Sequence, residues 1–297
     1  MSDTPTPSKV TIPYLHAQKA RGRKLAMLTA YDYPTAVLQD RAGLDIVLVG
    51  DSVGTNILGY RSEQQVTMED MLHHARAVRR GVERAFMLVD LPFMSYQPSV
   101  ERALLNAGRL VQEGGAEGVK LEGGSPVLPQ IEAMVRAGIP VMGHLGFTPQ
   151  SHGRELYVFS DRRGTVARVQ GREPAGARAL IEEAGRLEGA GVFGVVLEMV
   201  TEEVARLISQ RLSIPTIGIG AGRHCDGQVL TLNDLLGLSS FELRLAKSYA
   251  RLGEELLRVF RAYRQEVEQG NFPGEDNVFH MDAEEFRQLR ESLESAG

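Results

Sequence analysis

The chain has 297 residues, of which 43% are hydrophobic and 24% are charged, and its formal net charge is −5. This length suits one large α/β barrel or two smaller domains, and the hydrophobic content allows a sizeable core. The negative charge and the lack of a long Lys/Arg block argue against nucleic acid as a partner. No stretch approaches the length of a membrane span, so we expect no membrane partner either.

Residues 1–12 form a polar start that we predict to be a flexible N-terminal tail. Residues 1–9 are rich in Pro and Thr and contain no apolar signal core, so they do not resemble a secretion signal. The one cysteine, Cys225, excludes an intramolecular disulfide and fits a reducing compartment. We therefore expect a cytoplasmic protein.

The rest of the chain alternates apolar runs with segments of helical periodicity, beginning with a short amphipathic helix at 13–24. Strands are predicted at 25–30, 46–49, 86–90, 118–122, 139–144, 193–198 and 214–220, with a weaker eighth at 228–232. Further helices are predicted at 33–43, 68–80, 99–113, 126–137, 174–188, 202–211, 241–269 and 283–295. Thr67 is a good N-cap for the helix at 68–80, because Asp70 stands three positions further on.

This alternation predicts an α/β fold: a (β/α)₈ TIM barrel in a single domain, with extra N- and C-terminal helices. The rival is a doubly wound open sheet, whose phosphate-binding glycine turn should follow the first strand. Tyr31, Asp32 and Tyr33 stand there instead. We place the barrel domain at 13–280 and a C-terminal extension, to which we assign no function, at 281–297.

Ionisable residues follow or end the predicted strands, and we expect them to form one site. The carboxyl ends of the strands in such a fold lie at one edge, where α/β proteins place their sites. These residues are Asp51, Asp90, Lys120, Glu122, His144 and Glu198.

Asp51, Asp90 and Glu122 together supply three hard oxygen donors, which suit Mg²⁺ completed by water and substrate. The alternative is that each carboxylate is a helix N-cap or an ordinary loop residue. Lys120 lies two positions before Glu122, so on a strand the two side chains point to the same face. Three interpretations are open: a buried ion pair, a clamp on a substrate carboxylate or enolate, or a lysine that forms a Schiff base. Neighbouring carboxylates keep the lysine protonated and so argue against the Schiff base.

Glu198 follows an apolar run, where burial would raise its pKa toward the range that suits a base. The alternative is a structural carboxylate paired with an arginine. His144 lies among small residues that leave room for a ligand, although a lone histidine is more often an ordinary hydrogen-bonding group. The glycines at 218–222 resemble a phosphate cradle, but close packing at a barrel rim explains them equally well.

Ten short motifs together resemble the ketopantoate hydroxymethyltransferase family, and they occur in that family's order. They are TAYDY at 29–33, VGDS at 49–52, DLPFM at 90–94, VKLEGG at 119–124, GHLG at 143–146, TPQS at 148–151, VQGR at 169–172, LE at 197–198, IGIGAG at 217–222 and FPGE at 272–275. The resemblance covers roughly residues 13–280.

The resemblance implies a barrel of the phosphoenolpyruvate mutase/isocitrate lyase type, one Mg²⁺ per subunit and a cytoplasmic homo-oligomer, often a decamer. The implied reaction transfers a hydroxymethyl group from the co-substrate 5,10-methylenetetrahydrofolate to 3-methyl-2-oxobutanoate. The product is 2-dehydropantoate, which is used in pantothenate and coenzyme A biosynthesis. The reaction is expected to proceed through a Mg-stabilised enolate.

Carried over by motif, the metal positions are Asp51, Asp90 and Glu122, and Glu198 is the proton acceptor. The hypothesis is that Glu198 removes the C3 proton and that the resulting carbanion attacks the methylene carbon of the folate. Lys120 and His144 would balance negative charge around the oxo acid. The predicted substrate-binding residues are Asp51, Ser52, Asp90, Lys120 and His144.

Two segments depart from the family pattern: 152–168, which is longer and richer in arginine than usual, and 281–297.

A second enzyme hypothesis is carbon–carbon cleavage or phosphonate chemistry on a 2-oxo acid. Enzymes that catalyse such reactions usually use a cysteine from a loop. The only cysteine here, Cys225, follows the seventh predicted strand, which makes this the weaker alternative. A non-catalytic barrel is a third, and retention of the metal carboxylates, Lys120 and Glu198 argues against it.

Overall fold

The structure is a computed structural model, and it describes residues 8–151, 169–239 and 244–295. The chain divides into two compact units, Met1–Ala250 and Arg251–Gly297. This division falls earlier than the boundary at 280 that the sequence suggests, so the helix after residue 250 belongs to the second unit. The arginine-rich segment 152–168 lies outside the described residues.

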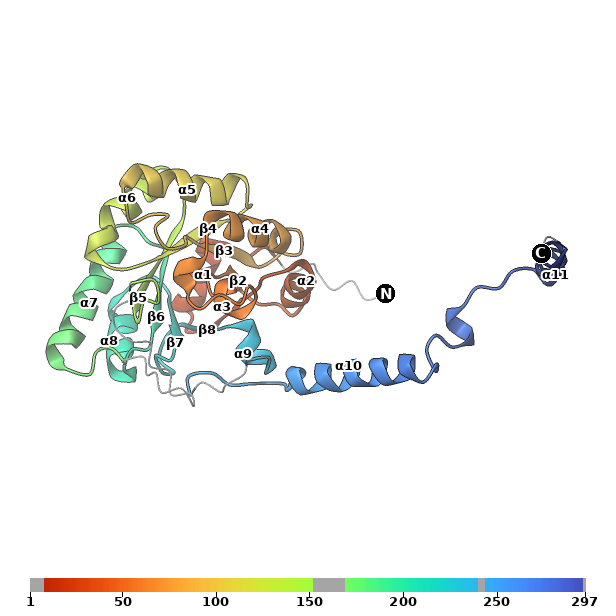
Figure 1. The fold of residues 1–297 in the computed structure, drawn as a ribbon. Helices are drawn as coiled ribbons and strands as arrows, with labels where there is room; N and C mark the ends of the chain where they lie inside the picture. The colour runs from red at the N-terminus through yellow and green to blue at the C-terminus, as the bar shows by residue number, and fades with distance from the viewer. Residues whose placement is uncertain (1–7, 152–168, 240–243, 296–297) are drawn as a thin grey trace. The chain divides into compact units, whose positions relative to one another are not determined.

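The first unit contains eight parallel strands that close into a barrel (Figure 1), which confirms the predicted fold class. Consecutive strands pair in order, and β1 also pairs with β8 to close the ring. The weak eighth run of the sequence is therefore a true strand. The strands are β1 Leu25–Thr29, β2 Ile46–Val49, β3 Phe86–Asp90, β4 Gly118–Glu122, β5 Val141–Gly146, β6 Gly194–Glu198, β7 Thr216–Ile219 and β8 Gly227–Leu230.

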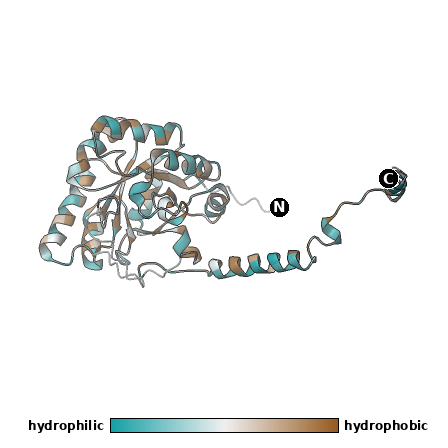
Figure 2. Cartoon of the chain, viewed as in Figure 1, coloured by the Kyte–Doolittle hydropathy of each residue, from teal (hydrophilic) through white to brown (hydrophobic). Residues whose placement is uncertain are grey.

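Helices surround the barrel and carry both hydrophobic and hydrophilic residues (Figure 2). Thr67 and Asp70 form the predicted capping box at the start of α4. In the first unit the helices are α1 Ile12–Ala20, α2 Tyr33–Arg41, α3 Val53–Asn56, η1 Glu63–Gln65, α4 Met68–Arg79, α5 Val100–Gln112, η2 Ser125–Val127, α6 Leu128–Arg136, α7 Pro174–Gly189, α8 Glu202–Arg211 and α9 Leu232–Leu236.

Alternate residues of the strands belong to two separate apolar layers. On β3, Met87 and Val89 join the large cluster that includes the helices, whereas Phe86 and Leu88 join a smaller cluster formed mostly by strand residues. Because strand side chains alternate between faces, the smaller cluster fills the barrel interior. Asp90 has the same parity as Leu88 and therefore extends this interior column to the carboxyl end of the strand.

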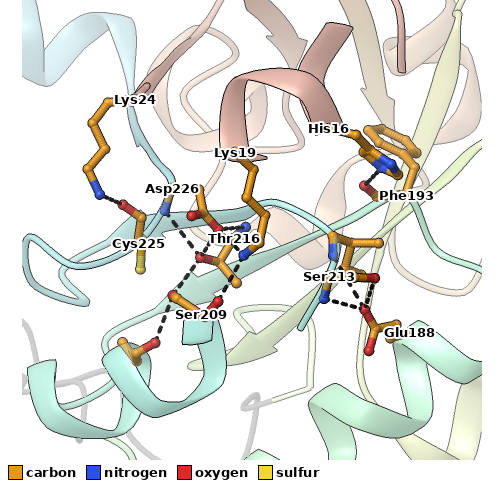
Figure 3. Close-up of polar contacts among 12 residues, drawn as sticks. His16, Lys19, Lys24, Glu188, Phe193, Ser209, Ser213, Thr216, Cys225 and Asp226 are labelled. Atoms are coloured by element: carbon orange, nitrogen blue, oxygen red, sulfur yellow. Dashed lines mark hydrogen bonds and ion pairs between the residues drawn. The ribbon is translucent and has the colours of Figure 1, made fainter. Parts of the chain in front are cut away.

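The amino end of the barrel is closed by α1 and the residues before it. Val10 and Leu15 are fully buried in the interior cluster. Around them, His16 Nε2 lies 2.9 Å from the carbonyl oxygen of Phe193, and Lys19 Nζ donates to Asp226 Oδ2 at 2.6 Å (Figure 3). These residues therefore cover the amino end of the barrel interior, whereas Asp90 lies at the carboxyl end.

The helix predicted at 241–269 is shorter than expected and begins at residue 252, as α10 Leu252–Glu268. Just before it, Ser248 Oγ donates to the carbonyl of Asp234, and the backbone N–H of Tyr249 donates to the carbonyl of Leu235. The bond from Tyr249 uses a backbone N–H that the longer helix would have needed, and the Ser248 side chain holds the same segment to α9. The second unit also contains η3 Glu275–Asn277 and α11 Ala283–Glu294, and no described helix is long and apolar enough to cross a membrane.

Candidate functional site

Five of the ionisable residues singled out by the sequence occupy interior positions at the carboxyl ends of their strands. The register places Asp90 beside Lys120, Glu122 beside His144, and Gly146 beside Glu198. Asp51 is the second residue after the end of β2, and its backbone N–H donates to Asp90 Oδ2 at 3.1 Å. The predicted convergence is therefore correct, and it spans strands β2 to β6.

Lys120 is the central cation of this group. Its Nζ lies 2.9 Å from Asp90 Oδ1 and 3.5 Å from His144 Nδ1. Burial alone would lower the pKa of Lys120, but the charges of Asp90 and Asp51 outweigh it and hold that pKa above its ordinary value. Lys120 is therefore an ammonium ion that can balance anionic charge, and it is unsuited to forming an imine.

His144 links Lys120 to the two glutamates. Its Nδ1 lies 3.6 Å from Glu122 Oε1, and its Nε2 lies 3.3 Å from Glu198 Oε2 without full hydrogen-bond geometry. Burial, together with the charge of Lys120, holds the pKa of His144 well below its ordinary value. A neutral ring with its proton on Nε2 matches these neighbours, since Nδ1 then faces the Lys120 ammonium as an acceptor and Nε2 carries its hydrogen on the side of Glu198.

Glu198 is more accessible than its neighbours, with 18% of its side chain exposed, whereas the side chains of Asp90 and Glu122 are 3% and 2% exposed. Burial raises the pKa of Glu198 to about 8; Lys120 opposes this rise and the charge of Asp51 adds to it. Exposure combined with a raised pKa is what a proton acceptor for a bound ligand requires. No arginine contacts Glu198 among the described residues, so the alternative of a structural ion pair with an arginine finds no support here.

Gln150, which the sequence interpretation did not single out, lies inside the site and is 1% exposed. Its side-chain nitrogen donates to Asp51 Oδ2 at 2.7 Å, and its backbone N–H donates to Glu122 Oε2 at 2.9 Å. Tyr96, also unpredicted, donates its hydroxyl to Gln150 Oε1 at 2.8 Å. The TPQS motif was the available signal, but a loop motif does not reveal contacts with residues so far away in the chain.

Ser52 lies at the edge of the site and is held by a second unpredicted tyrosine. The hydroxyls of Tyr31 and Ser52 lie 2.9 Å apart, and Asn56 Nδ2 donates to the Tyr31 hydroxyl at 3.2 Å. Nearby, Thr55 donates to Glu63 Oε1 at 2.9 Å, and burial with the charge of Asp51 raises the pKa of Glu63 to about 7. Ser52 is thus placed for a ligand contact by the residues after β1 and β2.

The site contains more carboxylates than cationic groups, and this excess of negative charge bears on whether the site suits a metal ion. Asp51, Asp90, Glu122 and Glu198 face one lysine and a neutral histidine. Burial raises the pKa of Asp90 to about 7 and that of Glu122 well above its ordinary value, which marks buried negative charge that lacks compensation. Hard carboxylate oxygens with unbalanced charge fit Mg²⁺ in their chemistry. In the arrangement observed, however, no three His, Cys, Asp or Glu side chains of the described chain converge as ligands.

The glycines at 218–222 and Cys225 are explained by close packing and need no role in ligand binding. A Cβ added at Gly222 would come within 2.5 Å of the Glu202 side chain, and one at Gly218 within 3.0 Å of Cys225 Sγ. Cys225 is fully buried just before β8, near Thr216 and Asp226 at the closed end of the barrel (Figure 3). Close packing thus explains these glycines, and the thiol lies away from the mouth that a cleavage reaction on an oxo acid would need.

Without a bound cation, the protein should become less stable as the pH rises from about 4.5 to about 8. The unfolded chain releases the Glu198 proton near 4.5, whereas the folded pKa is about 8. The folded state binds more protons between these values, so the free energy of unfolding falls with rising pH. Melting temperatures in EDTA would measure this decline, and Glu198→Gln should make it shallower. An equally steep decline in both proteins would contradict the raised pKa.

Comparison with known proteins gives a consistent assignment. Residues 9–275 match the sequence model of the family described as Ketopantoate hydroxymethyltransferase. A 3-methyl-2-oxobutanoate hydroxymethyltransferase of Moorella thermoacetica is 52% identical over 273 residues, covering 92% of this chain and 98% of that protein. A protein of the same name from Clostridium novyi is 50% identical over 275 residues, covering 92% and 97%.

Solved structures support the fold. A phosphonopyruvate hydrolase complex with oxalate and Mg²⁺ matches with a TM-score of 0.58 and 11% identity over 96% of both chains. A 2,3-dimethylmalate lyase, a member of the phosphoenolpyruvate mutase/isocitrate lyase superfamily, matches with a TM-score of 0.55 and 14% identity, covering 96% of this chain and 99% of that one. At such identities the likeness concerns the barrel and not the reaction.

Proposed function

Because this chain belongs to the ketopantoate hydroxymethyltransferase family, it is a hydroxymethyltransferase, and we propose that it acts on 3-methyl-2-oxobutanoate with 5,10-methylenetetrahydrofolate as donor. The product would be 2-dehydropantoate, a precursor of pantothenate. Membership of the family supports the reaction class and suggests the donor, and the roles of the residues below are inferred from the site.

The observation that carries the proposal is the arrangement of Glu198, His144 and Lys120 at the barrel mouth. A partly exposed carboxylate with a raised pKa lies 3.3 Å from a neutral imidazole, and the imidazole in turn lies 3.5 Å from a buried ammonium ion. The first group can accept a proton from carbon, and the last can balance the negative charge left behind. Base and cation are thus supplied by β6 and β4, the two strands that flank β5 and its His144.

In the proposed reaction, Glu198 accepts the proton from C3 of the oxo acid, and Lys120 stabilises the developing negative charge. The C3 carbon then forms a bond to the methylene carbon of the donor. Both bonds from that carbon to the two folate nitrogens break, and water supplies the hydroxyl group. The C3 proton accepted by Glu198 and the remaining proton of the water pass to the two nitrogens, and tetrahydrofolate leaves. His144 orients Glu198 and remains neutral, while Ser52 contacts the oxo acid from the opposite side of the site.

Asp51, Asp90 and Glu122 would hold Mg²⁺, which when bound supplies Lewis-acid polarisation of the substrate carbonyl. Their donor chemistry and the excess of buried acid support this assignment. The chain itself orients these carboxylates through backbone and amide donors, as the contacts of Asp90 and Asp51 show.

The proposal is tested by incubating the protein with 3-methyl-2-oxobutanoate in D₂O, with and without Mg²⁺, and following the C3 proton by NMR. We expect exchange that depends on the protein and is faster with Mg²⁺, and 2-dehydropantoate once the folate donor is added. Binding without exchange would favour the non-catalytic alternative. Breakage of a carbon–carbon bond would favour the cleavage alternative, and either result would refute the proposal.

A further inference from the structure

Gln150 contacts several segments of the barrel mouth that lie far apart in the chain. Besides its bonds to Asp51 and Glu122, its side-chain nitrogen donates to the carbonyl of Leu91 at 3.0 Å. Its own backbone carbonyl accepts from Gln64 Nε2 at 2.8 Å. One residue of the loop after β5 therefore connects segments that follow β2 and β3 with the end of β4.

The hydrogen-bond network fixes the orientation of the Gln150 carboxamide. Its oxygen accepts from the Tyr96 hydroxyl at 2.8 Å and from Gln97 Nε2 at 3.3 Å, while its nitrogen faces two acceptors, Asp51 Oδ2 and the Leu91 carbonyl. The flipped orientation would set the carboxamide oxygen against both acceptors. Both N–H groups and both lone pairs are thus in use, and the buried side chain is held in one arrangement.

This arrangement orients two of the three carboxylates assigned to the cation. The Gln150 donors engage Oδ2 of Asp51 and Oε2 of Glu122 and leave the other oxygen of each side chain available. A neutral amide adds no charge to a site that already has an excess of acid. Donors of this kind orient ligating carboxylates in metal sites, and their removal typically costs 10- to 100-fold in metal affinity.

We propose that Gln150 is a positioning residue for the cation site: it holds Asp51 and Glu122 in the orientation that binds a divalent cation, without itself contacting the ion. The inference rests on the proposed function, since it presumes that these carboxylates hold the metal. It explains why the side-chain amide and the backbone N–H of one buried residue each donate to a distant carboxylate, and why Tyr96 donates to that amide.

The test compares Mn²⁺ binding by the full-length protein and by Gln150→Met, without substrate, using the electron paramagnetic resonance signal of free Mn²⁺. Methionine has a similar length and no side-chain donor, so the bond to Asp51 is lost while the backbone N–H still donates to Glu122. The dissociation constant should therefore rise about 10- to 100-fold. Gln130→Met is the matched control. Gln130 is also buried and donates to the Tyr96 carbonyl at 3.4 Å, and it makes no recorded contact with the carboxylates; its dissociation constant should equal that of the wild type.

Gln97→Met provides a second, milder variant, because Gln97 Nε2 donates to the Gln150 carboxamide oxygen at 3.3 Å and makes no recorded contact with the carboxylates. It should weaken Mn²⁺ binding a few-fold. If Gln150→Met does not fold, this variant decides the question. Equal affinity in wild type and variant, or tighter binding after substitution, would overturn the inference while leaving the proposed reaction in place. A wild-type protein that binds no Mn²⁺ would overturn both this inference and the metal assignment.

Discussion

Replacing Glu198 by glutamine should slow the exchange of the C3 proton of 3-methyl-2-oxobutanoate at least about 100-fold, the lower range for loss of a general base. Glutamine keeps the size of the side chain and its position near His144, but it cannot accept a proton at any pH near neutrality. Mn²⁺ affinity should stay close to that of the wild type, because Glu198 is not among the carboxylates assigned to the ion. NMR in D₂O measures the first quantity, and Mn²⁺ titration measures the second.

Glu203→Gln is the matched control for this substitution. It makes the same chemical change on an exposed side chain of α8, only a few residues away in the chain. It should leave exchange unchanged. If Glu198→Gln exchanged at the wild-type rate, Glu198 would not be the base, and His144, 3.3 Å away, would be the next group to test.

The residues of the site that lie on strands were predictable, because the sequence pattern of a strand also indicates where its last residues lie in the barrel. An apolar run that ends in Asp90, or in Lys120 and Glu122, specifies both the strand and the end at which the polar group emerges. Once the strands close into a barrel, their parity directs these side chains inward. Local sequence is therefore sufficient to bring them together, and the structure confirms that convergence.

Gln150, Tyr96 and Tyr31 were missed because their roles depend on contacts across loops. Gln150 reaches Asp51 across 99 positions of the chain, and no periodicity of a loop encodes such a partner. The helix expected from residue 241 failed for a related reason: Ser248 and Tyr249 bond to α9 instead of continuing a helix. The homo-oligomer, the bound Mg²⁺ and the cytoplasmic location stay predictions.

The backbone around Glu198 is held more tightly than a strand end requires. Its carbonyl accepts from the N–H of Phe147 at 2.8 Å, and the N–H of Met199 donates to the carbonyl of Ile219 at 2.9 Å. Met199 has a φ of 48°, an uncommon value for a residue with a side chain. Glu198 is thus fixed between β5 and β7, and its position depends on how closely the end of β5 approaches.

Gly146 determines that approach, and Gly146→Ala should be among the most damaging single substitutions in the barrel. Its φ is +99°, and an added Cβ would lie 2.1 Å from the Glu198 carbonyl oxygen and 2.7 Å from Val200 Cγ2. Backbone cannot yield as a flexible side chain can, so β5 and β6 must separate, at a cost that we expect to exceed about 4 kcal/mol, the range reserved for specific disruptions. Urea unfolding would measure it.

Gly138→Ala separates the clash from the conformational strain. Gly138 also has a positive φ, +84°, but nothing lies within 4 Å of its added Cβ. The free energy of unfolding of Gly138→Ala should therefore fall by only about 1–2 kcal/mol, the penalty for placing an L-residue in the left-handed region. This variant should keep full exchange activity. Any Gly146→Ala protein that still folds should have lost that activity, because Glu198 moves with its carbonyl. Equal losses of stability in the two variants would show that the close approach of β5 to Glu198 does not position the base.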